Sequence, residues 1–310
     1  MKKVAYLHWA KTSDEIDLSH NWIKKLPSFL KDNYIMKYCP LKMKEIPLLE
    51  TAFFEVQLPY TLEEVNKKSD HYIQKFLDRV MEVLKENKIK MICFTEEANN
   101  TFEYSIPKSK GEYSNPFFVY GGILKVAGKT LQHTKVTILD GQNKTTDLIL
   151  YLIYPHVNYL NIVSDYPERF KVKSEEIYGD VGLNLQLLSH NKKIALEKSD
   201  VIIDCRDEFH TDFYYCNKKA VYFYIGTNKE IVKNIVIKCP HLMVIDDFIL
   251  SLQGKKYSTA FCEMIWFASK DWFDIIVSKE YTLEDLKQIH KELLRDGWKI
   301  EGFCRYGNLI

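Results

Sequence analysis

The sequence predicts an α/β protein of two domains, the second containing a mostly parallel sheet with helices on both faces. Two observations carry this prediction. From Lys135 to Thr227, short apolar runs alternate with helix-length segments, which is typical of parallel strands joined by crossover helices. In addition, 310 residues with a hydrophobic fraction of 46% are enough for two domains, each with its own core.

The second half of the chain supplies the strands of this sheet. The expected strands are Val136–Leu139, Tyr159–Val163, Leu183–Leu188, Val201–Cys205, Ala220–Gly226 and His241–Ile245. One of the intervening helices is expected from Arg169 to Tyr178, and Gly182 ends it, as glycine commonly ends helices. The segment Lys229–Lys238 fits either a helix or an extended strand.

The first half also has the pattern of an α/β domain. Its expected strands are Val4–Trp9, Asn33–Cys39 and Lys90–Phe94, and a helix is expected between Asp17 and Leu30. The clearest helix begins at the capping box of Thr61 and Glu64, and apolar residues follow at helical spacing as far as Lys88. The segment Leu41–Pro59 contains prolines and mixed polarity, and its pattern favours no element.

A polar, turn-rich segment indicates where the two domains meet. Residues 95–114 form the expected hinge, so we place an N-terminal α/β domain at 1–125 and the domain with the parallel sheet at 126–255. Residues 256–310 are expected to form C-terminal helices that pack back on the domain interface. The segments expected there are helices Thr259–Ser269 and Thr282–Arg295, and Trp298–Phe303 as a last strand or a segment packed on the first domain.

Composition argues against several kinds of partner and site. The formal net charge of +1 argues against nucleic acid and anionic membrane surfaces as partners. No uncharged run reaches the roughly 18 residues of a membrane-spanning helix. The apolar run Val4–Leu7 is too short for a signal peptide, so a cytoplasmic location is expected. The seven scattered cysteines predict reduced core thiols, and the lack of a CxxC or close histidine pair predicts no metal site.

The turn after Val136–Leu139 is the first candidate for cofactor binding. A dinucleotide-binding turn normally holds three glycines, which allow a tight turn and close approach of a pyrophosphate. This turn has one, Gly141, followed by a helix start where Asn143 or Thr145 can cap the helix or donate to a phosphate. Gln142 and Asn143 also occupy space that a pyrophosphate normally fills. The turn therefore fits either NAD or NADP, or a fold whose ligand has changed or been lost.

Asp165 is the second candidate for cofactor binding. It lies 24 residues after Gly141, at the end of the second expected strand. An acidic residue there can accept hydrogen bonds from a ribose hydroxyl, which favours NAD over NADP. The alternative is a structural role, in which Ser164 or Asp165 caps the helix that Pro167 opens.

The loop after Val201–Cys205 supplies the candidate catalytic residues. In doubly wound sheets, ligands gather outside the carboxyl ends of the strands. Cys205, Arg206 and His210 could there provide a nucleophile, an anion clamp and a base. The alternative is that Cys205 is a core thiol and His210 a solvated loop residue.

The region from residue 134 to 206 resembles the NAD(P)-binding domain of the shikimate dehydrogenase and glutamyl-tRNA reductase superfamily. The resemblance is carried by the segments Ser164–Arg169, Lys173–Glu176 and Glu197–Ile203. It implies a Rossmann fold, NAD or NADP as the cofactor and an oxidoreductase activity. Two features depart from the family: the glycine-rich turn is degenerate, and no Lys/Asp pair in the first domain matches the catalytic pair of the shikimate enzymes.

Two functions follow as hypotheses. The first is an NAD(P)-dependent oxidoreductase acting on a small substrate in an interdomain cleft, with the cofactor between Gly141 and Asp165 and the substrate near Cys205–His210. The second is a non-catalytic Rossmann-like protein that serves as a scaffold, sensor or partner-binding module. A transferase with a nucleotide-bearing donor also fits the fold, and a homo-oligomer is compatible with either hypothesis. Whether the turn from Asp140 to Thr146 leaves room for a pyrophosphate separates the first two.

Overall fold

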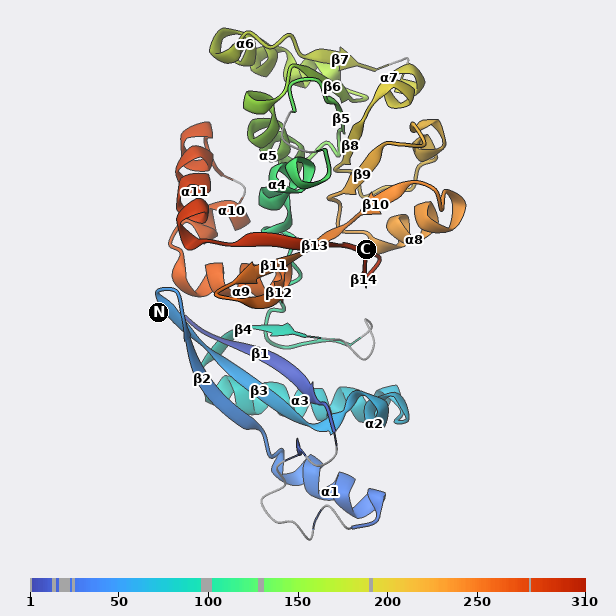
Figure 1. Cartoon of the computed structure of the whole chain (residues 1–310). Helices are drawn as coiled ribbons and strands as arrows, with labels where there is room; N and C mark the ends of the chain where they lie inside the picture. Colours follow the sequence, from blue (N-terminus) through green and yellow to red (C-terminus); the bar gives the residue numbers. More distant parts are fainter. Residues whose placement is uncertain are drawn as a thin grey trace. The chain divides into compact units, whose positions relative to one another are not determined.

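The computed structural model describes residues 2–12, 15–16, 23, 26–95, 102–127, 131–189, 192–278 and 280–310, and the chain divides into two compact units (Figure 1). Unit 1 comprises Met1–Gly111 and Ala260–Asp274, and unit 2 comprises Glu112–Thr259 and Ile275–Ile310. This division follows contacts within the folded chain. The three-part division at residues 125 and 255 remains a proposal about which parts fold independently.

Unit 1 is built on a four-stranded sheet in the order β2-β3-β1-β4. Its strands are β1 (Lys3–Ala10), β2 (Lys42–Leu48), β3 (Thr51–Thr61) and β4 (Ile89–Phe94). Strand β1 runs parallel to β3 and β4, whereas β2 and β3 form an antiparallel hairpin. The hairpin occupies the segment in which the sequence pattern favoured no element.

The helices of unit 1 correct two predictions. They are α1 (Ser28–Tyr38), α2 (Leu62–Asn66), α3 (Asp70–Glu86) and, from later in the chain, α9 (Thr259–Ser269) with the start of α10 (Phe273–Ser278). The strand predicted at Asn33–Cys39 is wrong, because these residues belong to α1, which ends where Cys39 adopts a φ of 42°. The helix predicted after Thr61 is two helices, since Thr61 caps only α2 and Ser69 caps α3. Most of the helix predicted at Asp17–Leu30 lies outside the described residues.

Unit 2 contains the predicted parallel sheet, with six strands in the order β7-β6-β5-β8-β9-β10. The strands are β5 (Lys135–Leu139), β6 (Tyr159–Val163), β7 (Gln186–Leu188), β8 (Val201–Asp204), β9 (Val221–Tyr224) and β10 (Met243–Ile245). All neighbouring pairs are parallel. Numbered along the chain, the order is 3-2-1-4-5-6, which is the Rossmann doubly wound arrangement. The predicted fold class is confirmed.

Helices cover both faces of this sheet. The helices of unit 2 are α4 (Asn115–Ala127), α5 (Lys144–Ile153), α6 (Lys171–Val181), α7 (Lys192–Lys198), α8 (Lys229–Lys238) and α11 (Leu283–Asp296), with the short 3-10 helices η3 (Tyr154–His156), η4 (Pro167–Phe170) and η5 (Asp212–Tyr215). Helix α11 packs on α5. Figure 1 shows α5 on one face and α7 and α8 on the other. Buried residues of α7 and α8, such as Leu196 and Val232, pack against Ile202 and Tyr222 of the sheet.

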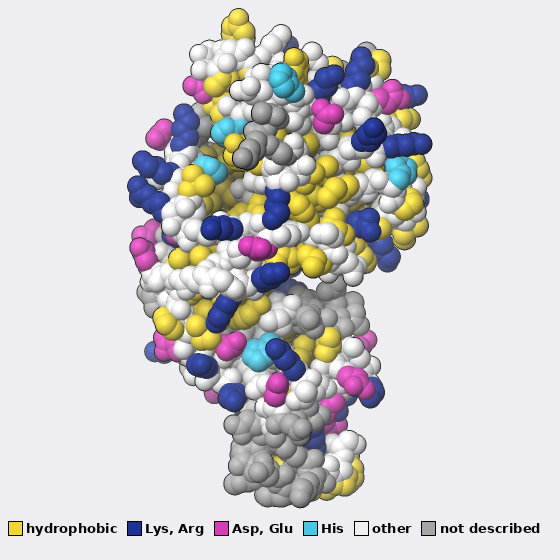
Figure 2. Space-filling model, in the orientation of Figure 1, with side chains coloured by type: hydrophobic (Ala, Val, Ile, Leu, Met, Phe, Trp, Pro, Cys, Tyr) yellow, Lys and Arg dark blue, Asp and Glu magenta, His cyan; other side chains and the backbone are white. Residues whose placement is uncertain are grey.

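A smaller antiparallel sheet completes unit 2. It has the strand order β12-β11-β13-β14, formed by β11 (Asp247–Leu252), β12 (Lys255–Ser258), β13 (Lys299–Arg305) and β14 (Asn308–Leu309). Of the two alternatives for Trp298–Phe303, the structure therefore has the strand. None of the described helices is long and apolar enough to cross a membrane. Figure 2 shows basic and acidic side chains interspersed over the visible face, in keeping with the net charge of +1.

Candidate functional site

The first candidate site is the carboxyl edge of the sheet between β5 and β8. The strand order reverses between these two strands, and ligands of doubly wound sheets bind at such a switch point. Two turns meet there, one beginning with Asp140 after β5 and the other with Cys205 after β8. The register continues into them, since the Cys205 amide donates to the Leu139 carbonyl at 3.1 Å.

Asn143 ties the two turns together. Its Nδ2 donates to the carbonyl oxygen of Cys205 at 3.1 Å, and its Oδ1 accepts from the Thr146 amide at 3.1 Å, which caps α5. Gly141 packs so closely on the same carbonyl that a Cβ at this position would lie 1.9 Å from the Cys205 oxygen. The space between the strand ends is therefore filled by the protein itself.

The backbone amides of the turn are also occupied. Gly141 N donates to the Thr146 hydroxyl at 3.0 Å, and Gln142 N donates to the Asp140 carboxylate at 2.8 Å. Together with the capped amide of Thr146, three of the donors nearest the helix start already have protein acceptors. A phosphate bound at a helix start needs amides that are free to donate.

A buried ionic network of two carboxylates and two cations lies beside this edge. The Asp140 side chain accepts from the Ser164 hydroxyl at 2.6 Å and from Arg169 Nη1 at 3.1 Å. Arg169 also bonds Asp147 at 3.3 Å, and Lys173 lies 2.5 Å from the same carboxylate. The Arg169 guanidinium thus forms ion pairs with both buried carboxylates, those of Asp140 and Asp147.

The predicted cofactor residues lie in two kinds of surroundings. Gly141 and Asn143 meet at the switch point, and Thr145 is half-buried in the first turn of α5. Asp165 is exposed after β6 and forms no hydrogen bond or ion pair with any described residue. The cap predicted as the alternative role of Ser164 or Asp165 takes a different form, because Ser164 Oγ accepts from the Tyr166 amide at 3.0 Å.

The second candidate site is a cluster around Asp204 at the end of β8. The fully buried Asp204 carboxylate accepts from Arg206 Nε at 2.9 Å, bonds His210 Nε2 at 2.7 Å and accepts from the Tyr222 hydroxyl. Arg206 Nη1 also donates to Asp212 at 2.7 Å. Within the described residues His210 Nδ1 is buried without a hydrogen-bond partner. The structure thus brings Arg206 and His210 together, with Asp204 between them.

Electrostatics in this cluster favours the ionised form of Asp204. Burial alone would raise the pKa of this carboxyl group. The charge of Arg206 and the hydrogen bonds from His210 and Arg206 outweigh burial and hold the pKa well below its usual range. Burial raises the pKa of the Tyr222 hydroxyl, and the charge of Asp204 raises it further. Tyr222 therefore serves as a neutral donor to this carboxylate.

Cys205 stands apart from Arg206 and His210. Side chains of consecutive residues along a strand point to opposite faces, and the Cys205 thiol lies beside the Thr146 hydroxyl of α5, whereas Asp204 faces η5. Burial raises the pKa of the thiol, and the charge of Asp204 adds to the effect. A buried neutral thiol is a poor nucleophile. Its predicted catalytic role stays a prediction that this geometry does not favour.

The sequence interpretation did not include Asp140, Arg169 and Asp204 among the candidate residues. Asp140 directly follows β5 and Asp204 is the last residue of β8, and a charged residue directly after an apolar run is a signal that the sequence carries. The pairing of Arg169 with Asp140 spans 29 residues and has no local signal. In the part of the chain that the structure describes, no group of three or more His, Cys, Asp or Glu side chains could hold a metal ion.

The chain is similar to several solved structures at low sequence identity. No protein-family model matches this sequence, and a search of curated proteins finds no similar one. A quinate dehydrogenase from Corynebacterium glutamicum in complex with NAD is 9% identical, with 95% of this chain and 99% of that chain covered and a TM-score of 0.36. An L-tryptophan dehydrogenase from Nostoc punctiforme is 12% identical, with 96% and 84% covered and a TM-score of 0.35.

The comparisons also include a protein of another class. An aspartate transcarbamoylase from Trypanosoma cruzi is 10% identical, with 78% of this chain and 76% of that chain covered and a TM-score of 0.36. A shikimate dehydrogenase from Aquifex aeolicus is 11% identical, with 93% of this chain and 96% of that chain covered and a TM-score of 0.33. The fold assignment for unit 2 rests on its own strand order.

Proposed function

We propose that this protein is a non-catalytic Rossmann-type module, a sensor or partner-binding protein that does not hold a dinucleotide at the switch point. The observation that carries the proposal is the bridge from Asn143 Nδ2 to the Cys205 carbonyl at 3.1 Å. It joins the two strand ends between which a dinucleotide enters in this fold. The nearby amides of Gly141 and Gln142 already donate to acceptors of the same turn.

Charge supports the same conclusion. A pyrophosphate brings two negative charges, and here it would approach the carboxylates of Asp140 and Asp147, both less than a tenth exposed. Arg169 would have to leave these carboxylates to bind the phosphates. Asp147 would keep Lys173, but Asp140 has no second cationic partner among the described residues, and a buried carboxylate that loses its counter-charge costs about 3–5 kcal/mol.

The test is thermal unfolding with NAD, NADH, NADP and NADPH, each at about 1 mM. A ligand that binds only the native state stabilises it by about 2.7 kcal/mol at 100 times its dissociation constant. We expect no change in melting temperature with any of the four. A clear rise with one of them that Asp165→Ala abolishes contradicts the proposal, because it places the dinucleotide at the switch point.

An NAD(P)-dependent oxidoreductase acting on a small substrate is the second candidate, because one observation favours it. Asp165 presents an exposed carboxylate after β6, without a partner among the described residues, where a ribose hydroxyl is bound in dinucleotide-binding domains of this fold. In this case Asp165→Ala abolishes the rise in melting temperature. Glu168→Ala, which removes another exposed carboxylate three residues further on, leaves it unchanged.

A further inference from the structure

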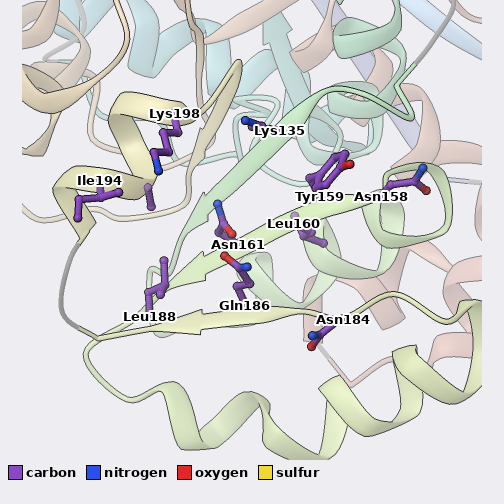
Figure 3. Close-up of a pocket in the computed structure, with 11 residues that line it drawn as sticks. Lys135, Asn158, Tyr159, Leu160, Asn161, Asn184, Gln186, Leu188, Ile194 and Lys198 are labelled. Atoms are coloured by element: carbon purple, nitrogen blue, oxygen red, sulfur yellow. The ribbon is translucent and has the colours of Figure 1, made fainter.

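A concavity of about 470 Å³ lies on the face of the large sheet that carries α7 (Figure 3). It is lined by residues at the starts of β5, β6 and β7 and by α7. It exists because α7 has seven residues and β7 has three, so that this helix covers only part of the face. The volume is in the range of small-molecule sites. The concavity is separate from the turns at the carboxyl ends of β5 and β8.

A row of polar side chains runs from the floor of this concavity to the buried Thr137 of β5. Gln186 of β7 pairs in register with Asn161 of β6, and Asn161 pairs with Thr137 of β5. Strands of a parallel sheet are normally apolar on both faces, because helices cover both. Figure 3 shows Asn161 and Gln186 side by side on the floor. Thr137 is buried and hydrogen-bonded to Ser199, whereas Asn161 and Gln186 line the concavity, so no helix covers this part of the face.

A chain of hydrogen bonds fixes the orientation of Asn161. Ser199 Oγ donates to the Ala195 carbonyl at 2.7 Å, so this hydroxyl has no second hydrogen for Thr137. The Thr137 hydroxyl, 2.6 Å away, therefore donates to Ser199 and accepts from Asn161 Nδ2 at 3.0 Å. Asn161 Nδ2 is thus held toward Thr137, and Oδ1 is left as an acceptor in the half-buried floor.

Two cations stand on one side of this floor. Lys135 at the start of β5 and Lys198 at the end of α7 are exposed, and neither amino group has an ion-pair partner among the described residues. The acidic neighbour Asp200 accepts from the Lys135 backbone amide at 2.9 Å. Figure 3 shows both lysines on the side of Asn161 opposite to Gln186. The concavity thus combines a cationic side with a carboxamide floor.

We propose that this concavity binds a nucleoside monophosphate. The phosphate fits the cationic side, because exposed ammonium groups attract phosphate and each contributes donors. The base fits the floor, because a carboxamide offers a planar donor-acceptor edge of the kind that pairs with a purine. Tyr159, which pairs in register with Lys135 and is 53% exposed, provides an aromatic ring at the rim. The site lies apart from the switch point, so it does not depend on whether a dinucleotide binds there.

The experiment is isothermal titration of the full chain with adenosine 5′-monophosphate, adenosine and inorganic phosphate. The variants are Lys198→Gln, which removes a cation at the concavity, and Gln186→Leu, which removes an exposed amide of the floor. The matched control is Lys193→Gln, an exposed lysine of the same helix that does not line the concavity and lies 3.8 Å from Glu197. Circular dichroism confirms that each variant is folded.

We expect saturable binding of the monophosphate, weakened about tenfold by Lys198→Gln and by Gln186→Leu and unchanged by Lys193→Gln, where tenfold corresponds to about 1.4 kcal/mol. Adenosine and inorganic phosphate should each bind at least about ten times more weakly than the monophosphate. No saturable binding at about 1 mM overturns the proposal. Binding that survives both variants, or inorganic phosphate that binds as well as the nucleotide, also overturns it. A negative result in this titration does not affect the thermal-unfolding test with dinucleotides, because that test concerns the switch point at Asn143 and Asp165.

Discussion

Replacing Asp204 by asparagine tests whether the cluster at the end of β8 stabilises unit 2. The carboxylate is fully buried and bonds Arg206 at 2.9 Å, His210 at 2.7 Å and the Tyr222 hydroxyl. In Asp204→Asn the Arg206 charge loses its largest counter-charge. Removing one partner of a buried ion pair costs about 3–5 kcal/mol, because the other charge is left unpaired. For a unit of this size we expect the melting temperature to fall by roughly 6–20 °C.

The assay is thermal and urea unfolding followed by circular dichroism, with hydrogen exchange to locate the loss of protection at β8 and β9. Asp165→Asn is the control, because this exposed carboxylate has no partner among the described residues and its replacement should change stability by less than about 0.5 kcal/mol. A change below about 1 kcal/mol in Asp204→Asn would refute the reasoning. It would mean that water reaches the cluster or that Asp212 alone neutralises Arg206.

The same variant has a predicted pH dependence. The folded-state pKa of Asp204 is held below its unfolded value, chiefly by Arg206 acting against burial. Its contribution to stability is therefore fully present above about pH 4 and is lost as the pH falls toward the folded pKa. Asp212 behaves in the same direction, because hydrogen bonds from Arg206 and Lys192 outweigh its burial and lower its pKa. The acid limb of the stability curve should be shallower in Asp204→Asn than in the native chain, but should not disappear.

Three further predictions concern packing, thiol reactivity and capping. Gly141→Ala should destabilise the fold by about 1–3 kcal/mol, because the new Cβ would lie 1.9 Å from a backbone oxygen. Gly179→Ala places a Cβ that meets nothing within 4 Å inside α6, so this substitution should stabilise the fold by about 0.5–1 kcal/mol. Equal effects of the two substitutions in urea unfolding would contradict the packing argument. Peptide mass spectrometry after iodoacetamide treatment should find Cys205 unmodified in the native chain and modified in urea, and rapid native labelling would show that the thiol is accessible. Thr282→Ala should cost about 1 kcal/mol in thermal unfolding, since the Thr282 hydroxyl caps α11, and an unchanged melting temperature would show that this helix end is stabilised by other contacts.

The Rossmann-type sheet could be predicted because its central strands are buried on both faces. Such strands appear in a sequence as short apolar runs, and Val136–Leu139 and Val201–Cys205 coincide with β5 and β8 to within a residue. Unit 1 gave weaker signals. Most residues of β2 are exposed or half-buried, and this strand contains Pro47. Helix α1 fully buries only Ile35. The sequences of β2 and α1 therefore show no clear apolar period.

The candidate sites could be predicted only in part, because residues close in sequence diverge in the structure. Arg206 and His210 share the Asp204 carboxylate, but Cys205 belongs to the opposite face of the sheet. The degenerate turn after β5 was visible in the sequence. That Asn143 would bond a carbonyl 62 residues away could not be read from it, since this contact depends on the pairing of β5 with β8.

The hydrogen-bond chain beneath the concavity gives a remote residue influence over what the floor presents. Ser199 is fully buried and does not line the concavity, yet its donation to Ala195 sets the direction of every bond as far as Asn161. In Ser199→Ala the Thr137 hydroxyl is free to donate toward Asn161, whose carboxamide can then turn over and offer N–H groups instead of Oδ1. The hydroxyl oxygen of Ser199, one layer below the floor, thus determines whether Asn161 accepts or donates hydrogen bonds there.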